Sequence, residues 1–389
     1  MRDSPTYKVL IAGAGSAALE AAFRLQHVGE DRIDTTILAP DGEFATHAMA
    51  VLIPFAAGDI PHEPVAGLAL QAGARLRRGR LASVDPEAHQ VVTTEGEAIG
   101  YDALLIAVGA IQRVPQRHVL AFGAPGTEER MHGLVQDLEE GFARRIAFVV
   151  PGGATWPVPL YELALMAADR AYEMGMDPEL TLATWERAPL ELFGAEASDA
   201  LAARLAERGI AVVTGVHAEF PAAGLVELHP GGRRLAVDRV VTMPTLEGPA
   251  VDGLPHDADG FLAVDRYGRV QGVPDVYAAG DATHHAIKQG GLACQQADAA
   301  AEAIAAQAGA ALEPEPYAAI LQGVLLTQRA ATYLRREATA DSLVPHEAVW
   351  WPPTKIAGRE LSRHLGRQSP HTAAAAREGV EIHRPLVRA

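Results

Sequence analysis

A glycine-rich turn directly after a short apolar segment constrains the fold of this chain more than any other feature. Residues 7–12 have the apolar pattern of a buried strand, and the turn Gly13-Ala-Gly15-Ser-Ala-Ala18 leads from them into residues with helical spacing. In this context the first glycine makes the turn, the second lets the backbone approach a pyrophosphate, and a small third residue lets helix and strand pack closely. The segment therefore predicts an α/β fold with a dinucleotide site.

A second segment further along the chain repeats this order of strand, turn and helix. Residues 275–279 have a buried-strand pattern, Gly280 and Asp281 end it, and Gly290 opens an alanine-rich helix that runs to about Ala306. Backbone N–H groups at a helix start are unpaired and carry partial positive charge, which favours an electron-rich group there. The alternative is a strand, a turn and a core helix without a ligand, because short motifs produce false positives.

Length, charge and cysteine content limit the classes of protein. The chain has 389 residues, 49% of them hydrophobic, which is enough for more than one core. A net charge of -16 argues against nucleic acid as the main partner. The single cysteine, Cys294, excludes an internal disulfide and fits a reducing compartment. With no signal-peptide pattern and no apolar run of about 18 residues, we expect a cytoplasmic protein, with the inner face of the membrane left open.

The middle of the chain predicts a second unit of the same kind. Residues 80–97 read as a small β-meander and residues 101–109 as a buried strand ending in glycine. Strands are then expected at 145–150, 180–184 and 210–213, helices at 160–174 and 197–208, and a further meander up to residue 240. The loop at residues 151–161 lacks the third glycine and contains three prolines, each of which removes an N–H group that a pyrophosphate would need.

Together these motifs resemble the FAD-dependent pyridine nucleotide-disulfide oxidoreductase-like superfamily over roughly residues 7–366. The proline-rich second loop, the Lys288-Gln289-Gly290 helix start and a C-terminal extension are similar to the sulfide:quinone oxidoreductase-like and type II NADH dehydrogenase-like branch. The resemblance implies two Rossmann-like, three-layer ββα dinucleotide-binding domains with inserted β-meanders and a C-terminal α+β extension. Residues 1–112 and 243–315 would form the FAD-binding domain, 113–242 an NAD(P)-binding-like domain, and 316–389 the extension.

The resemblance also implies FAD as the cofactor, and no metal site is predicted. Asp281 would hold the ribityl chain, and the helix at Gly290 would point at the pyrimidine end of the isoalloxazine. The second strand departs from the family pattern, because its acid, Asp41, comes two residues late; it either serves the adenosine ribose or is a surface turn acid. The predicted cofactor-binding residues are Gly13, Gly15, Ser16, Ala17, Ala18, Ala39, Pro40, Asp41, Thr46, Leu81, Ala82, Val108, Gly109, Ala110, Gly280, Asp281, Lys288, Gln289 and Gly290.

In addition to Cys294, four residues are candidates for contact with the reacting face of the flavin. Lys288 would stabilise negative charge on the reduced flavin. Glu162 lies in the first turn of a helix, where the family often has a glutamate near the flavin. Trp156 would line a slot for a flat substrate or pack the seam between domains. His47 lies on a segment that passes near the flavin in the family, although a lone histidine is more often an ordinary surface residue.

Cys294 has two interpretations. On the second turn of the flavin-facing helix it could form a thiolate beside the ring, or it could be a small core residue, which we favour. Because the sequence contains no second cysteine, a dithiol reductase is excluded and a polysulfide-forming sulfide:quinone mechanism is disfavoured.

The region after about Glu315 predicts two short strands, at residues 320–326 and 331–336, around the turn Thr327-Gln328-Arg329. Trp350 and Trp351 then precede a basic helix. It would either lie at a membrane surface, where a lipid quinone is reached, or pair with the acidic body of the protein while the tryptophans cover the flavin. Its basic residues are Lys355, Arg359, Arg363 and Arg367, and its apolar side is Ile356, Leu361 and Leu365.

The sequence therefore predicts an FAD-dependent oxidoreductase that passes electrons from a small-molecule reductant to a quinone-like acceptor. Two alternatives remain: an NAD(P)H dehydrogenase with an unusual nicotinamide site, and a non-catalytic flavin-binding or regulatory module. The expected partners are the two small molecules, the membrane surface through the C-terminal region, and a second copy in a homodimer, with no nucleic acid.

Overall fold

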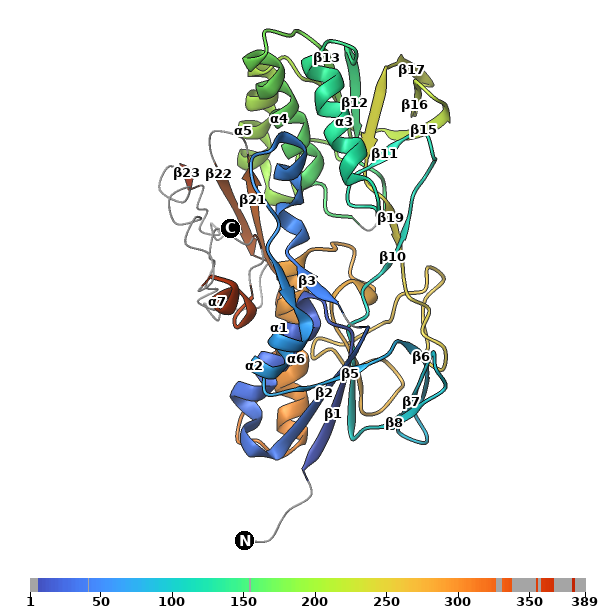
Figure 1. The fold of residues 1–389 in the computed structure, drawn as a ribbon, viewed down its shortest axis with the longest axis vertical. Helices are drawn as coiled ribbons and strands as arrows, with labels where there is room; N and C mark the ends of the chain where they lie inside the picture. Colours follow the sequence, from blue (N-terminus) through green and yellow to red (C-terminus); the bar gives the residue numbers. More distant parts are fainter. Residues whose placement is uncertain are drawn as a thin grey trace.

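The computed structural model describes residues 6–40, 42–153, 155–326, 331–337, 355, 358–366 and 380–381. Two units, each built on a five-stranded parallel sheet, lie one above the other in Figure 1. Strands β10 (Ile111–Arg113) and β19 (Thr245–Glu247) pair antiparallel between them. The chain therefore crosses from the first unit to the second and returns beside its own path.

Strand β1 (Tyr7–Ala12) is central in the first unit because its residues are apolar on both faces. Val9 and Ile11 pack with the helices, whereas Leu10 and Ala12 pack with a small meander, the pattern of a parallel sheet covered on both sides. The sheet order is β20 (Val276–Ala278), β9 (Ala103–Ile106), β1, β2 (Ile33–Ala39) and β5 (Arg75–Arg78). The covering elements are α1 (Ser16–Gly29), α2 (Val65–Gln71), α6 (Gly290–Gln307), β6 (Leu81–Asp85), β7 (Gln90–Thr93) and β8 (Ala98–Gly100).

The second unit repeats this three-layer arrangement, as the sequence predicted. Along its central strand, Phe148 packs toward the helices, whereas Ala147 and Val149 pack toward the meander. The sheet order is β11 (Leu120–Ala121), β18 (Arg239–Thr242), β12 (Arg145–Val149), β13 (Glu179–Ala183) and β14 (Ala211–Val213). The covering elements are α3 (Glu128–Glu139), α4 (Val158–Glu173), η3 (Glu191–Phe193), α5 (Ala195–Glu207), β15 (His217–Ala222), β16 (Leu225–His229) and β17 (Arg233–Ala236).

One segment of the first unit reaches into the core of the second. Strands β3 (Glu43–Ala45) and β4 (His62–Pro64) pair antiparallel around the 3-10 helix η2 (His47–Phe55). Figure 1 shows this blue segment extending upward to α3 and α4. Val51 and Phe55 are buried in the core of the second unit. These contacts explain why the residues of η2 are mostly apolar.

The two predicted strands of the C-terminal region are present as β21 (Ile320–Leu326) and β22 (Ala331–Glu337), and β23 (Val380–Glu381) pairs parallel with β22. The prediction of one basic helix that includes Lys355 is wrong, because helix α7 spans only Leu361–Gly366. Lys355 has a left-handed backbone, with φ 52°, which a regular helix does not allow.

The described part of this basic segment faces the protein body. Leu361 and Leu365 are buried in the core formed by α1 and α6, and Arg359 forms an ion pair with Glu302 on α6. No helix among the described residues is long and apolar enough to cross a membrane. Several residues of the C-terminal prediction lie outside the described residues, namely Thr327, Gln328, Arg329, Trp350, Trp351, Ile356 and Arg367.

Candidate functional site

A cavity of about 680 Å³ opens where the strands of the first sheet end at their carboxyl termini. In open α/β sheets this edge is where ligands bind. The structure brings most of the predicted cofactor-binding residues to this cavity: Gly13, Gly15, Ser16, Ala17, Pro40, Leu81, Val108, Gly109, Gly280, Asp281, Lys288, Gln289 and Gly290.

The two glycines of the first turn have different steric surroundings. Gly13 has φ 121°, and a Cβ atom there would lie 2.1 Å from the carbonyl oxygen of Ala107, at the end of β9. A Cβ atom at Gly15 would meet nothing within 4 Å, and its backbone is extended, with φ -80° and ψ -171°. Gly13 is therefore required by the packing of β1 against β9, whereas Gly15 keeps the cavity open at the start of α1.

Asp281 stands at the end of β20 on the wall of this cavity. Burial raises the pKa of its carboxyl group, while the charge of Lys288 acts in the opposite direction. Gly280 beside it has φ 75°, and a Cβ atom there would lie 3.1 Å from that of Ala17 and 3.4 Å from that of Ala293. Small residues on α1 and α6 thus let the two helix starts and the end of β20 converge on one place.

Lys288 is almost fully buried at the start of α6. Its Nζ donates hydrogen bonds to the carbonyl oxygens of Asp281, at 3.1 Å, and of Thr283, and it lies 3.9 Å from the ring centroid of Phe261. Burial lowers the pKa of Lys288 to about 8, although nearby carboxylates oppose the shift. The side-chain oxygen of Gln289 accepts a hydrogen bond from the N–H of Leu292 and caps the helix.

The remaining predicted cofactor residues lie elsewhere. Ala18 and Ala39 are core residues, Thr46 is buried at the start of η2, and Ala82 is exposed on β6. The other two are Ala110, which is half-buried just past the cavity, and Asp41, which is outside the described residues. A role of Asp41 at the ribose therefore stays a prediction.

Arg80 also lines the cavity, beside Leu81, and was not among the residues predicted from the sequence. It is one of few cations on this wall and follows β5, so it is placed to meet a phosphate or adenosine group. Its position between β5 and the meander was the signal, because the residue that follows a parallel strand faces the ligand edge of the sheet.

A second cavity, of about 700 Å³, lies between the two units and shares Ser16, Lys288, Gln289 and Gly290 with the first. His47 and Trp156 both line it. Trp156 meets the ring of Phe193 edge-on, with centroids 5.8 Å apart, and a Cβ atom at Gly323 on β21 would lie 3.4 Å from the Trp156 ring. The tryptophan therefore both packs the seam and forms a wall of the cavity.

Glu162 does not line either cavity but holds a residue that does. It is fully buried on α4 and forms an ion pair with Lys355, while accepting a hydrogen bond of 2.6 Å from the N–H of Leu326. Burial raises the pKa of Glu162 and lowers that of Lys355, while their mutual attraction opposes both shifts. Lys355 lines the second cavity, a placement that its position in the sequence did not reveal.

Replacing Lys355 with methionine should destabilise the protein by about 3–5 kcal/mol in urea unfolding, because it leaves a buried carboxyl group without its ion partner. The loss of stability should grow as the pH rises above the ordinary range of a glutamate pKa. In that range the carboxyl group is ionised in the unfolded chain, whereas the unpaired Glu162 of the folded variant either carries a buried charge or keeps its proton, and both cost free energy. In the control, Glu162→Gln with Lys355→Met, the amide still accepts from Leu326 N–H, so most of the stability should return. Equal stability of both variants would contradict this account.

Cys294 lies in the packed core between α1 and α6 and does not line either cavity. Burial, followed by the charges of Glu20 and Asp298, raises the pKa of its thiol well above the usual value. The structure therefore gives no support to a thiolate beside the flavin.

We expect the native protein to react with no maleimide at neutral pH and the urea-unfolded protein to react at its one cysteine, because only an accessible thiolate is nucleophilic. A Cys294→Ala variant should reduce its flavin at the wild-type rate in stopped-flow measurements. Rapid labelling of the folded protein would show that the thiol is accessible.

The loop of the second unit differs from a working pyrophosphate turn. A Cβ atom at Gly152 would lie 3.1 Å from the His217 ring, and Gly152 does not line either cavity. Glu186 follows β13, where such domains place an acid for the ribose. Its carboxylate is instead buried and accepts hydrogen bonds from the hydroxyl groups of Tyr161, at 2.7 Å, and Thr184, at 3.0 Å.

The first cavity fits FAD. A helix start with an open glycine suits a pyrophosphate, Asp281 places a carboxyl group on the cavity wall, and Lys288 lines both this cavity and the second one. Two parallel-sheet units with this site define a two-domain flavin-dependent oxidoreductase.

Residues 7–301 match the model of the pyridine nucleotide-disulphide oxidoreductase family. The chain belongs to this family, and its cofactor is FAD. It is 27% identical to oxidoreductase ptaL of Pestalotiopsis fici over 295 residues, covering 70% of this chain and 76% of that protein.

The chain is also similar to a second relative and to a solved structure. An NADH dehydrogenase-like protein of Mycobacterium tuberculosis is 27% identical over 299 residues, covering 70% of this chain and 72% of that protein. The fold is similar to that of the sulfide:quinone oxidoreductase of Aquifex aeolicus, with a TM-score of 0.76, 18% identity, and coverage of 86% of this chain and 87% of that one. At this identity the second likeness concerns the fold alone.

Proposed function

We propose that the protein passes electrons from a small reductant through FAD to a quinone-like acceptor. One observation carries the proposal: the second cavity shares Ser16, Lys288, Gln289 and Gly290 with the cavity that fits FAD. A molecule in the second cavity therefore lies directly against the inner end of the cofactor site. FAD supplies the two-electron chemistry when it is bound.

The residues of the chain bind, orient and exclude water. Asp281 and the turn at Gly15 hold the cofactor, and the Lys288 ammonium group places positive charge where the two cavities meet. Residues of β21 and of η2 both line the second cavity, so they would limit the access of water to a substrate there.

The lining of the second cavity favours an aromatic acceptor. Its apolar side chains outnumber its polar ones, and pockets of this kind hold flat rings that are oriented by a few polar groups. His47, Gln112 and Lys355 are polar groups placed to contact the oxygens of such a ring. The apolar lining includes Ile53, Pro54, Phe122, Met131, Trp156, Pro159, Met243 and Val324.

An NAD(P)H dehydrogenase is the second candidate, and the likeness to the NADH dehydrogenase-like protein favours it. Against it, the loop at residues 151–161 contains three prolines, each of which removes an N–H group that a pyrophosphate would need. The Glu186 carboxyl group is also already hydrogen-bonded to Tyr161 and Thr184. We therefore expect nicotinamide coenzymes to be poor donors.

A reductant panel tests the proposal. The purified holoprotein is mixed anaerobically with sulfide, NADH and NADPH in turn, and the loss of the visible flavin absorbance is followed, with reoxidation by a short-chain quinone. Reduction by a non-nicotinamide donor and reoxidation by quinone support the proposal. Rapid reduction by NADH would favour the second candidate, and a protein that releases no FAD on heating would support a non-catalytic module instead.

Contact with a membrane surface through the C-terminal region is part of the same proposal. Sedimentation with liposomes, using the full chain and a chain ending before Trp350, tests it. Equal binding of both chains would remove the C-terminal region as the contact.

A further inference from the structure

Two carboxyl groups are buried side by side between α1 and α6. Glu20 is 0% exposed and Asp298 is 9% exposed, and the two groups are close enough for the charge of Glu20 to act on the pKa of Asp298. Burial raises the pKa of Glu20, and burial together with the charge of Glu20 raises the pKa of Asp298 well above its usual range. Two adjacent buried carboxylates cannot both ionise at low cost, so burial and mutual repulsion favour a state in which the pair keeps one proton.

Glu20 also holds the C-terminal segment of residues 358–366. Its two carboxylate oxygens accept hydrogen bonds of 2.7 Å each from the backbone N–H groups of Glu360 and Leu361, where α7 begins. A Cβ atom at Gly358 would lie 2.6 Å from Glu20 Oε2 and 3.0 Å from Cys294 Sγ. The segment is therefore packed directly against Glu20 and Cys294.

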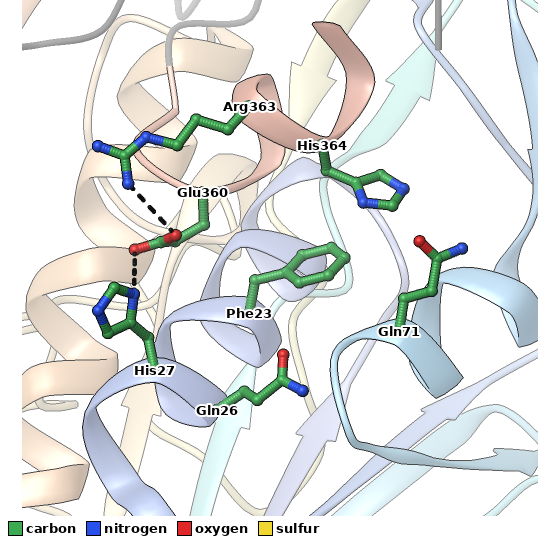
Figure 2. Close-up of a pocket in the computed structure, with 7 residues that line it drawn as sticks. All are labelled: Phe23, Gln26, His27, Gln71, Glu360, Arg363 and His364. Carbon is green, nitrogen blue, oxygen red and sulfur yellow. Dashed lines mark ion pairs between the residues drawn. The ribbon is translucent and has the colours of Figure 1, made fainter. Parts of the chain in front are cut away.

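The charged groups around Glu20 and Asp298 lie on α1, on α6 and on the C-terminal segment of residues 358–366. Arg24 on α1 and Arg359 both bind Glu302 on α6, and the charges of both arginines lower the pKa of Asp298 in part. Figure 2 shows the outer face of the contact, where a cavity of about 550 Å³ is bordered by Glu360 between His27 and Arg363, and by Phe23 stacked on His364.

We propose that Glu20 and Asp298 form a proton-dependent latch, which holds residues 358–366 on α1 and α6 and so keeps Lys355 in the wall of the second cavity. While Asp298 donates its proton to Glu20, the pair carries one charge, which the two backbone N–H groups and the nearby arginines stabilise. When the second proton leaves, two charges face each other in a water-poor interior, and undocking of the segment lets water reach them. Glu20 and Asp298 are thus positioning residues that act through Lys355.

The sign of the pH dependence follows from the raised pKa. The docked state binds about one more proton than the undocked state between the ordinary range of an aspartate pKa and the raised pKa of the pair. Docking is strongest below this window and weakens by up to about tenfold per pH unit through it. Above the raised pKa it weakens no further.

Hydrogen exchange of the holoprotein, followed by mass spectrometry in a series of increasing pH, tests the latch. The readout is the exchange rate of the peptide containing Leu361, divided at each pH by the rate of the same peptide in Asp298→Asn, so that the chemical exchange rate cancels. The asparagine amide donates to Glu20 at every pH, so we expect the ratio to rise by up to about tenfold per pH unit within the window. A ratio that stays constant, or faster exchange in Asp298→Asn at all pH values, would overturn the proposal.

Gly358→Ala provides a test that leaves both carboxyl groups in place. The added methyl group must displace the held Glu20 carboxylate, so the Leu361 peptide should exchange at least about tenfold faster than in the wild type, as expected when charge-assisted hydrogen bonds are lost. Unchanged exchange would show that the segment is not held at this contact.

The consequence for Lys355 rests on the proposed function, whereas the docking itself does not. In the holoenzyme, the KM for a short-chain quinone should rise with pH in the wild type but not in Asp298→Asn, and kcat should change less. A KM with the same pH dependence in both proteins would overturn the link to the cavity. If no donor reduces the flavin, the exchange measurement still decides the latch.

Discussion

A Gly13→Ala variant should lose its fold. The added Cβ atom would lie 2.1 Å from the carbonyl oxygen and 2.6 Å from the carbonyl carbon of Ala107, and the backbone at φ 121° is one that side chains rarely adopt. Relief requires that β1 and β9, two paired strands of the first sheet, move apart. We expect a loss of more than about 4 kcal/mol in urea unfolding, or no folded protein at all.

Gly15→Ala is the matched control, because it makes the same chemical change two residues away. Its Cβ atom meets no protein atom within 4 Å, so the apoprotein should keep its wild-type urea midpoint. The methyl group would occupy space on the cofactor side, where overpacking costs about 1–3 kcal/mol. This corresponds to roughly fivefold to 150-fold weaker FAD binding in a fluorescence titration. Normal FAD affinity in Gly15→Ala would show that the cofactor does not approach this turn.

Replacing Lys288 with methionine should lower the midpoint potential of the bound flavin. Lys288 lines both cavities, and loss of a charged hydrogen-bond donor costs about 1.5–3 kcal/mol. For a two-electron couple this is roughly 30–60 mV. Because burial lowers the pKa of Lys288 to about 8, the difference from the wild type should shrink as the pH rises through that value.

Spectroelectrochemical titration below and above this pH measures the effect. Lys8→Met is the control, because Lys8 is exposed on β1 and does not line the cavity, so its removal should leave the potential unchanged. Equal potentials in Lys288→Met and the wild type at low pH would show that Lys288 serves only to order the loop through the carbonyl groups of Asp281 and Thr283.

The elements that the sequence predicted well have patterns confined to a few adjacent residues. The turn at Gly13, the buried strand before it and the alanine-rich helix after Gly290 all lie in the structure where the pattern placed them. The same holds for β21, whose bounds match the predicted strand. In each case the period of apolar residues and the need for a glycine are set by local backbone geometry.

Predictions for the basic C-terminal segment failed where they depended on distant parts of the chain. Arginines at a spacing of four residues suggested one helix, but Glu20 accepts the N–H groups of Glu360 and Leu361, and α7 begins there. Spacing alone cannot supply the residue that caps a helix from another element.

The sequence by itself determined that this chain repeats the fold of a dinucleotide-binding unit and that the first unit has a turn suited to FAD, because these follow from short-range patterns. Only the tertiary structure decided which side chains surround the second cavity. It paired Glu162 with Lys355, 193 residues later, buried Cys294 in the core, and joined Glu20 to the N–H groups of Glu360 and Leu361. The burial, charge and protonation of each group depend on neighbours that folding brings from remote positions, and the order of residues does not specify those neighbours.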